Sequence, residues 1–218
     1  MILYHFPTSP YGRRVRMTLA MKGLTAELRD ARSNPEHAAE VRRLNPVGKV
    51  PVLVDGERVI CDSAAICAYL DEQVPAPRLF PAGTDAALAH EIVALTNYVI
   101  DTFVDLGLRS AALADHARYA EVCAQYMQRV NGAFVTLAKY AAATGDGKVG
   151  VAGDTWSVAD IALFTFVTWL EGLPARAAAF PPAQQMLNLG WTLPSALVTW
   201  ADAHRNRPDA HASAANAT

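Results

Sequence analysis

The chain has 218 residues, of which 52% are hydrophobic and 18% are charged, and its formal net charge at pH 7 is -2. This composition is typical of a compact globular protein and argues against a disordered chain. The near-neutral charge gives no electrostatic reason to expect nucleic acid or an anionic membrane as a partner, so small-molecule chemistry is the better starting hypothesis.

No run of about eighteen apolar residues is present that could span a bilayer. The N-terminus also lacks the basic patch, apolar stretch and cleavage site of an export signal, so we expect a cytoplasmic protein without a membrane partner. The cysteines Cys61, Cys67 and Cys123 form neither a CxxC pair nor a metal-ligand spacing. We therefore expect buried core thiols, with no disulfide framework and no metal site.

The first 76 residues alternate short strands and helices. Residues 1–6 are apolar and rich in β-formers, and Ser9-Pro10 then begins an apolar-periodic helix that ends near Gly23. Residues 26–30 alternate as a strand does. Asn34-Pro35 opens the next helix, with Asn34 as its N-cap.

A hairpin and a third helix follow. Residues 50–54 and 58–61 flank Asp55-Gly56, a dipeptide that favours a tight type I′ turn. Asp62-Ser63 then begins a helix that runs to about Gln73. The predicted order is βαβαββα.

The remainder is predicted to be helical. Residues 77–83 are rich in proline and are assigned as a linker, because neither helix nor strand tolerates proline well. Residues 84–208 are an all-helical domain, with helices at 84–112 and 115–144, a loop at 145–153, and a third helix whose start carries the capping-box pair Ser157 and Asp160. Residues 209–218 have little apolar surface and are predicted to be a disordered tail.

Three local motifs stand in a fixed order: TSPYGRRVR at 8–16, NPVGKVPVL at 45–53 and CDSAAICAYL at 61–70. With the order of elements, they resemble the cytosolic-type glutathione S-transferase family, in its bacterial, serine-type form, over nearly the whole chain. The resemblance implies an α/β N-terminal thioredoxin-like domain (βαβαββα) at 1–76, which binds glutathione, followed by an all-α C-terminal domain that holds the electrophile.

The second motif is the most specific. In the family it resembles, the bond corresponding to Val50-Pro51 is cis, which turns the backbone N–H and C=O of the preceding residue outward. The resemblance implies that these groups of Val50 pair with the cysteinyl unit of glutathione, as in β-augmentation, and that Lys49 lies near the glycine carboxylate. The alternatives are an ordinary proline at a strand start and a solvated lysine.

The third motif provides a second binding position. A serine at a helix N-terminus presents a hydroxyl and an unpaired backbone N–H at the positive end of the helix dipole, which suits a carboxylate. The resemblance implies that Ser63 binds the γ-glutamyl carboxylate and Asp62 the γ-glutamyl ammonium. Alternatively, both residues only cap the helix. His37 lies roughly where some classes place a basic side chain for the glycine end.

The first motif carries the proposed chemistry. A thiol with a pKa of about 8.5 is mostly protonated at neutral pH, and a donor at a helix N-terminus lowers that pKa. Ser9 matches the serine of the S-P-[FY]-x-x-R-V pattern and is the expected catalytic residue; Thr8 and Tyr4 remain alternatives. A hydroxyl has one proton and two lone pairs, so Ser9 can cap the helix and also donate to a thiolate.

The same loop disfavours two related activities. The cysteine-type classes that exchange thiols and disulfides would require a cysteine at or beside position 9, and none is present. The isomerase class with an S-S-C-S loop is disfavoured for the same reason. Arg13, Arg14 and Arg16 are interpreted as a solvated helix face, not as an anion site.

The expected function is therefore a glutathione transferase, in which glutathione is the co-substrate and its thiolate attacks a small apolar electrophile. Two alternatives remain on the same fold. One is a non-catalytic protein that binds glutathione or hydrophobic ligands, and the other is a glutathione-dependent peroxidase or dehalogenase. The resemblance further implies a homodimer.

Overall fold

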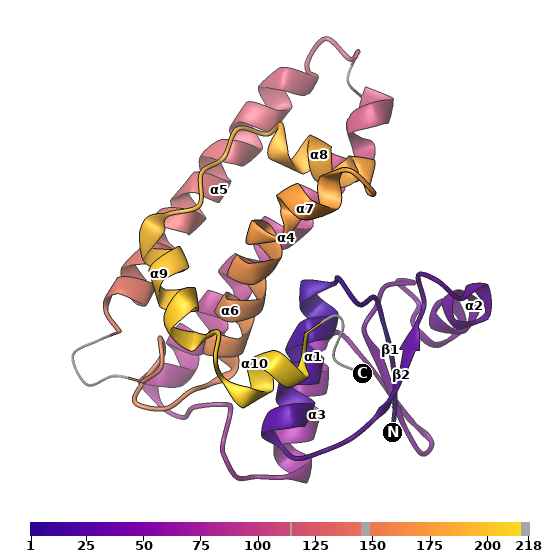
Figure 1. The fold of residues 1–218 in the computed structure, drawn as a ribbon, viewed down its shortest axis with the longest axis vertical. Helices are drawn as coiled ribbons and strands as arrows, with labels where there is room; N and C mark the ends of the chain where they lie inside the picture. The colour runs from indigo at the N-terminus through magenta and orange to yellow at the C-terminus, as the bar shows by residue number, and fades with distance from the viewer. Residues whose placement is uncertain (114, 145–148, 215–218) are drawn as a thin grey trace. The chain divides into compact units, whose positions relative to one another are not determined.

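The computed structural model describes residues 1–113, 115–144 and 149–214. The chain divides into two compact units. One comprises residues 1–81 together with 204–218, and the other comprises residues 82–203 (Figure 1). The first unit therefore includes C-terminal residues that the sequence assigned to the helical domain and to the tail.

A four-stranded sheet lies at the centre of the first unit. Its strands run in the order β2-β1-β3-β4, with β1 parallel to β2 and the other pairs antiparallel. Asp55 pairs with Arg58 across the predicted hairpin, and Gly56 has a φ of +59°, which a tight turn requires and glycine adopts without strain. The strand bounds are Ile2–His5 (β1), Glu27–Asp30 (β2), Val52–Asp55 (β3) and Arg58–Cys61 (β4).

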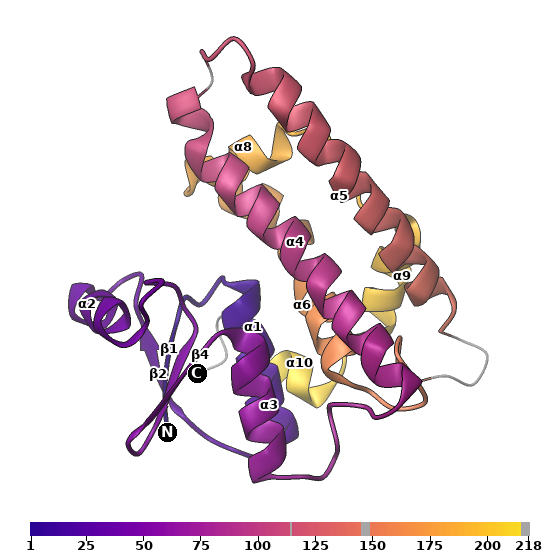
Figure 2. The same ribbon diagram turned by 180° about the vertical axis from the view of Figure 1, so that it is seen from behind.

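Three helices cover the two faces of this sheet. They are α1 (Pro10–Met21), α2 (Pro35–Leu44) and α3 (Ser63–Gln73), and α1 and α3 lie together on one face while α2 lies on the other (Figures 1 and 2). Tyr4 and Val52 pack with Val41 of α2. Because side chains alternate along a strand, the buried neighbours Leu3 and Leu53 point to the face of α1 and α3. The predicted α/β order βαβαββα is confirmed.

The helix starts follow the predicted caps. Ser9 accepts a hydrogen bond from the backbone N–H of Gly12, and Asn34 accepts from Glu36 N–H at 2.9 Å. Asp62 accepts from the N–H groups of Ala64 and Ala65. Each cap satisfies backbone donors that a helix leaves unpaired in its first turn.

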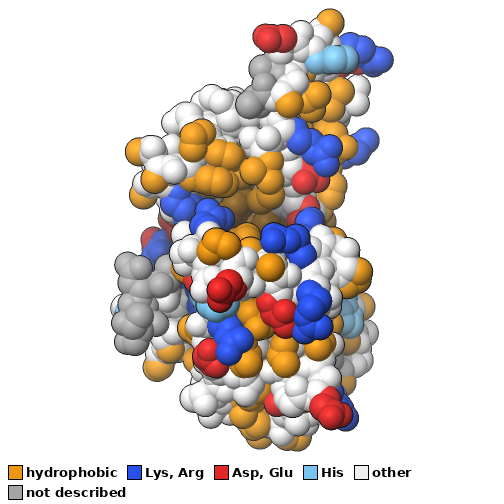
Figure 3. Space-filling model, turned by 90° about the vertical axis from the view of Figure 1, so that its right-hand side faces the viewer, with side chains coloured by type: hydrophobic (Ala, Val, Ile, Leu, Met, Phe, Trp, Pro, Cys, Tyr) orange, Lys and Arg blue, Asp and Glu red, His pale blue; other side chains and the backbone are white. Residues whose placement is uncertain are grey.

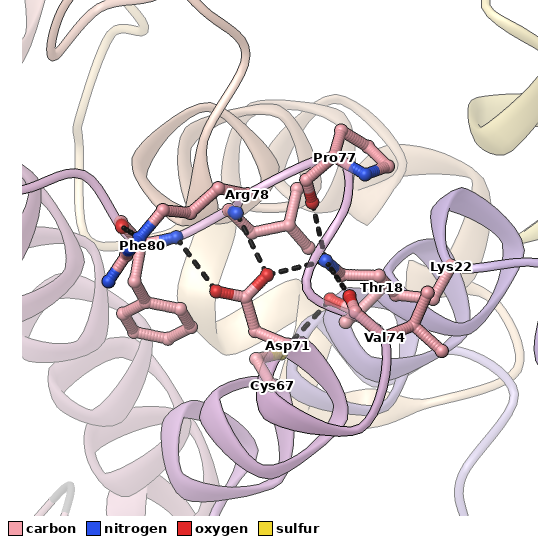
Figure 4. Close-up of polar contacts among 9 residues, drawn as sticks. Thr18, Lys22, Cys67, Asp71, Val74, Pro77, Arg78 and Phe80 are labelled. Atoms are coloured by element: carbon pink, nitrogen blue, oxygen red, sulfur yellow. Dashed lines mark hydrogen bonds and ion pairs between the residues drawn. The ribbon is translucent and has the colours of Figure 1, made fainter.

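A buried ion pair joins α1, α3 and the segment after α3 (Figure 4). The Lys22 ammonium lies 2.5 Å from Asp71 Oδ1, and their side chains are 0% and 6% exposed. The remaining groups in this network are backbone atoms: the ammonium donates to the carbonyls of Val74 and Pro77, and the carboxylate accepts from the N–H groups of Leu79 and Phe80. This network fixes residues 74–80, part of which the sequence assigned to a linker.

The C-terminal segment packs on α1, beside which it lies in both ribbon views (Figures 1 and 2). Residues Pro208–Ala212 form α10, and Arg13 and Arg16 donate hydrogen bonds to it and to Ser213. The predicted disordered tail is therefore wrong for residues 209–214; residues 215–218 lie outside the described part. The solvated face predicted for the arginines is also wrong, because Arg14 and Arg16 are buried and Arg13 is half-buried.

The second unit is helical, as predicted. The predicted helices correspond to α4 (Thr84–Leu113), α5 (Tyr119–Ala142) and α6 (Val158–Glu171), and Ser157 and Asp160 form the predicted capping box. Of the predicted loop at 145–153, residues 145–148 lie outside the described part. The sequence did not resolve the shorter helices α7 (Leu173–Ala177), α8 (Pro181–Leu187) and α9 (Ser195–His204).

Within the described ranges, no helix is both long and apolar enough to cross a membrane. Basic and acidic side chains are interspersed on the face drawn in Figure 3.

Cys67 is a buried core thiol, as predicted, and burial raises its pKa to about 11. Cys61 and Cys123 are only half-buried, so that expectation was wrong for them.

Candidate functional site

Ser9 lies at the N-terminus of α1, where the first strand has ended and a short loop turns the chain. Its Oγ accepts from Gly12 N–H at 3.3 Å, and its own N–H donates to the Phe6 carbonyl at 3.0 Å. Its hydroxyl proton has no acceptor among the residues that the structure describes. Ser9 can therefore cap the helix and still donate to a ligand.

The start of α3 offers a second set of donors. Ser63 is its first residue, and its N–H makes no hydrogen bond to any described residue. Asp62 has a φ of +76°, a left-handed conformation that is unusual for a residue with a side chain. Its Oδ1 accepts the two capping bonds, whereas its Oδ2 is not bonded to any described residue. A carboxylate and an ammonium can thus be accommodated at this helix end.

Arg14 brings the two helix starts together. Its buried guanidinium donates from Nη1 to Ser63 Oγ at 3.2 Å, so the start of α3 lies beside the second turn of α1. Because arginine can only donate, Ser63 uses a lone pair in this bond and keeps its own proton for a ligand. Arg14 also lies over the Tyr11 ring, 5.4 Å from its centroid.

The loop before β3 presents the third group. The Val50-Pro51 bond is cis, as the resemblance implied. Neither the N–H nor the C=O of Val50 is hydrogen-bonded to another described residue. The buried Asn45 side chain holds this loop, because it donates to the Lys49 carbonyl at 2.7 Å and accepts from Val47 N–H at 3.0 Å. The Lys49 residue itself is exposed.

The alternatives to Ser9 have different surroundings. Thr8 is exposed in the same loop. Tyr4 points to the face covered by α2, and its hydroxyl accepts from Arg29 Nη1 at 2.9 Å. His37 of α2 lies beside Tyr4, with ring centroids 6.0 Å apart, and its Nδ1 donates to the Asp30 carbonyl. Tyr4 is therefore engaged on the opposite face of the sheet from α1, whereas Thr8 and Ser9 lie in the loop that leads into α1.

Comparison with known proteins identifies the first domain. Residues 3–78 match the family model described as glutathione S-transferase, N-terminal domain. These residues are a glutathione S-transferase domain. The resemblance predicted from the three motifs is thus confirmed, and the rest of the chain follows the same family's fold, with a largely helical region after the sheet.

Curated proteins are similar in sequence to part of this chain. A "probable maleylacetoacetate isomerase" from Vibrio cholerae is 46% identical over 85 residues, which cover 37% of this chain and 40% of that protein. "Glutathione S-transferase Z1" from Arabidopsis thaliana is 43% identical over 81 residues, which cover 36% of this chain and 37% of that protein. The match therefore spans about two fifths of these curated relatives.

A solved structure extends the likeness to nearly the whole chain. It is a glutathione S-transferase from Methylobacterium radiotolerans in complex with glutathione sulfonate, with a TM-score of 0.73 and 27% identity. The alignment covers 97% of this chain and 92% of that one. The fold is thus shared across both units.

Sequence reasoning missed two residues that organise the glutathione S-transferase domain. Asn45 precedes a proline, a setting in which asparagine commonly forms turns, so its position was a usable signal. Arg14 had no such signal, because an arginine on a helix can be solvated or buried, and only the position of Ser63 in space distinguishes the two.

Proposed function

We propose that this chain is a glutathione transferase, which binds glutathione in its first domain and stabilises the thiolate at Ser9. The Ser9 hydroxyl carries the proposal, because its oxygen caps α1 while its proton has no acceptor among the described residues. The match to the family's N-terminal domain and the neighbour solved with glutathione sulfonate support glutathione as the ligand.

The binding roles follow the groups that are available. The backbone of Val50 pairs with the cysteinyl unit, and Pro51 completes the turn that presents it. The start of α3 takes the γ-glutamyl end, with Ser63 donating to its carboxylate and Asp62 accepting from its ammonium. Lys49 pairs with the glycine carboxylate from the loop before β3.

The reaction follows from stabilising the thiolate. The thiol proton is released to solvent, and the Ser9 hydroxyl and the N-terminal end of α1 stabilise the negative sulfur. The sulfur then forms a C–S bond with an apolar electrophile. In an addition the electrophile takes up the electron pair, and in a substitution the leaving group departs with it.

Variants of Ser9 separate its two roles. Ser9→Ala removes a hydrogen bond to a charged group, worth about 1.5–3 kcal/mol, so turnover of a chlorodinitrobenzene falls roughly ten- to hundredfold. Ser9→Asp keeps a helix cap but offers no proton, and it should fold normally while losing the thiolate. Ser9→Thr restores a hydroxyl. Thr8→Ala is the matched control, and a larger loss there than in Ser9→Ala would transfer the role to Thr8.

A second candidate is a glutathione-dependent isomerase. The observation favouring it is the name of the Vibrio cholerae relative, "probable maleylacetoacetate isomerase". The match to that protein covers only 37% of this chain, and the loop at 8–16 has no cysteine. Isomerisation of maleylacetoacetate without net consumption of glutathione, and without thioether formation, would favour this candidate over the transferase.

The same assays distinguish the other functions predicted from the sequence. Glutathione binding without turnover across a panel of electrophiles, hydroperoxides and alkyl halides would indicate a binding protein. Turnover of a hydroperoxide or an alkyl halide would indicate a peroxidase or a dehalogenase. Homodimer formation and cytoplasmic location stay predictions, and gel filtration at the mass of a monomer would contradict the first.

A further inference from the structure

Arg16 is a buried arginine that joins three separate segments of the first unit. Its Nε and Nη2 donate to the Ser213 carbonyl at 3.1 and 2.9 Å, and Nη2 also donates to the Pro7 carbonyl at 3.0 Å. Its Nη1 lies 2.8 Å from His5 Nδ1. Because arginine can only donate, His5 Nδ1 is the acceptor, and the neutral ring carries its proton on Nε2.

These partners of Arg16 are all uncharged. No carboxylate lies within ion-pair distance of Arg16 among the residues that the structure describes. Burial, and then Arg13, lowers the pKa of Arg16 to about 10, and burial followed by Arg16 lowers that of His5 to about 4. A buried charge without a counter-ion depends on its hydrogen bonds, so loss of any one of these contacts strains the others.

Arg13 strengthens the same attachment. Its Nη2 donates to the Ala210 carbonyl at 3.2 Å, and its Nε donates to Ser213 Oγ at 3.3 Å. The last carbonyls of a helix have no partner within the helix, and arginine side chains commonly satisfy them. Residues 208–213, here called the C-terminal strap, are thus held to α1 by both arginines.

Arg16 also contacts the loop that carries Ser9 and the strand that precedes this loop. Pro7 lies two residues before Ser9, and His5 ends the strand that enters the loop. The loop also packs closely on α1, because a Cβ at Gly12 would lie 3.2 Å from the His5 Cβ and 3.3 Å from the Phe6 carbonyl oxygen. The loop therefore lies against the first turn of α1, and Arg16 contacts it at Pro7 and the preceding strand at His5.

We propose that Arg16 is a positioning residue, and that through it the C-terminal strap holds the Ser9 loop in the conformation that presents the hydroxyl to the ligand. This inference rests on the proposed function of Ser9. It assigns a role in the first domain to residues more than 190 positions away in sequence, as the Arg16 to Ser213 contact shows.

A matched pair of substitutions in the full-length chain tests the proposal. Ala210 is 2% exposed, so Ala210→Glu places a charge where the strap packs and should release it. Ala212→Glu makes the same change at an exposed position of α10 and is the control. Amide hydrogen exchange at Ser9 reports the loop without any ligand, while kcat, KM for glutathione and the pKa of the bound thiol report the site.

The expected result is specific to Ala210→Glu. Exchange at the Ser9 amide accelerates roughly tenfold, and the thiol pKa rises by about one unit, which lowers the thiolate fraction and kcat by up to about tenfold at neutral pH. KM for glutathione changes little, and Ala212→Glu behaves as wild type. Arg16→Lys, which keeps the charge but cannot span the same acceptors, should show the same pattern if Ala210→Glu does not fold.

Two outcomes distinguish a failure of the proposed strap from a failure of the proposed function. If Ala210→Glu frees residues 208–213 to exchange while Ser9 exchange and kcat match those of Ala212→Glu, the strap does not position the loop and the proposal is overturned. If wild type binds no glutathione, the proposed function fails. Faster exchange at Ser9 in Ala210→Glu alone would then still support the link between strap and loop.

Discussion

Lys22→Met tests the buried ion pair of Figure 4. Methionine keeps the length of the side chain but removes its charge, so the Asp71 carboxylate and two backbone carbonyls lose their shared partner. Because the two side chains are almost fully buried, water cannot replace the ammonium. Removing one member of such a pair costs about 3–5 kcal/mol, and we expect this loss in the free energy of unfolding.

The control is the exposed pair of Arg43 and Glu40, whose side chains are 67% and 34% exposed. Arg43→Met should cost far less than Lys22→Met, because solvent screens an exposed pair. Urea denaturation followed by far-ultraviolet circular dichroism measures both variants. Tryptophan fluorescence separates the units, because all four tryptophans lie between residues 156 and 200, in the second unit. If Lys22→Met costs no more than Arg43→Met, the reasoning is wrong.

Three further predictions follow from single contacts. Gly12→Ala should destabilise the fold by about 1–3 kcal/mol, because a Cβ at this position meets the loop before α1. Gly132→Ala on α5 should stabilise the fold by about 0.5–1 kcal/mol, because a Cβ there would have no tertiary neighbour within 4 Å among the described residues. Thermal denaturation compares the two variants. Because His5 has a pKa of about 4 when folded, below its ordinary 6.5, the unfolded chain binds more protons between these pH values, so stability falls as the pH drops from 6.5 towards 4. His5→Asn keeps an acceptor for Arg16 and should flatten that slope in urea denaturation at a series of pH values; an unchanged slope would contradict the assignment. Asp160→Asn should cost about 2–3 kcal/mol, measured by tryptophan fluorescence, because an amide cannot accept all three bonds that its carboxylate now accepts; a loss below 1 kcal/mol would contradict this.

The parts of the fold that depend on local chemistry were predictable from the sequence. Ser9-Pro10 and Asn34-Pro35 mark helix starts because a short polar side chain caps the helix and proline suits its first turn. Asp55-Gly56 marks the hairpin because its turn requires positive φ. The cis bond at Val50-Pro51 came from the resemblance and not from any local rule.

The parts that depend on distant partners were not predictable. The strap has a composition typical of a disordered tail, and it is ordered because Arg13 and Arg16 reach its carbonyls from α1. No pattern near residue 213 indicates that partner. The burial of Arg14 and Arg16 could not be predicted for the same reason. A charged side chain on a helix is expected to be solvated unless its buried hydrogen-bond acceptors are known.

A crystal structure of the wild-type chain with glutathione would test the central claim most directly. We expect the sulfur within hydrogen-bonding distance of Ser9 Oγ and the cysteinyl backbone paired with Val50. A sulfur that contacts Thr8 or Tyr4 instead, or a soak at millimolar glutathione that leaves Ser9, Val50 and Ser63 without a bound tripeptide, would contradict the account.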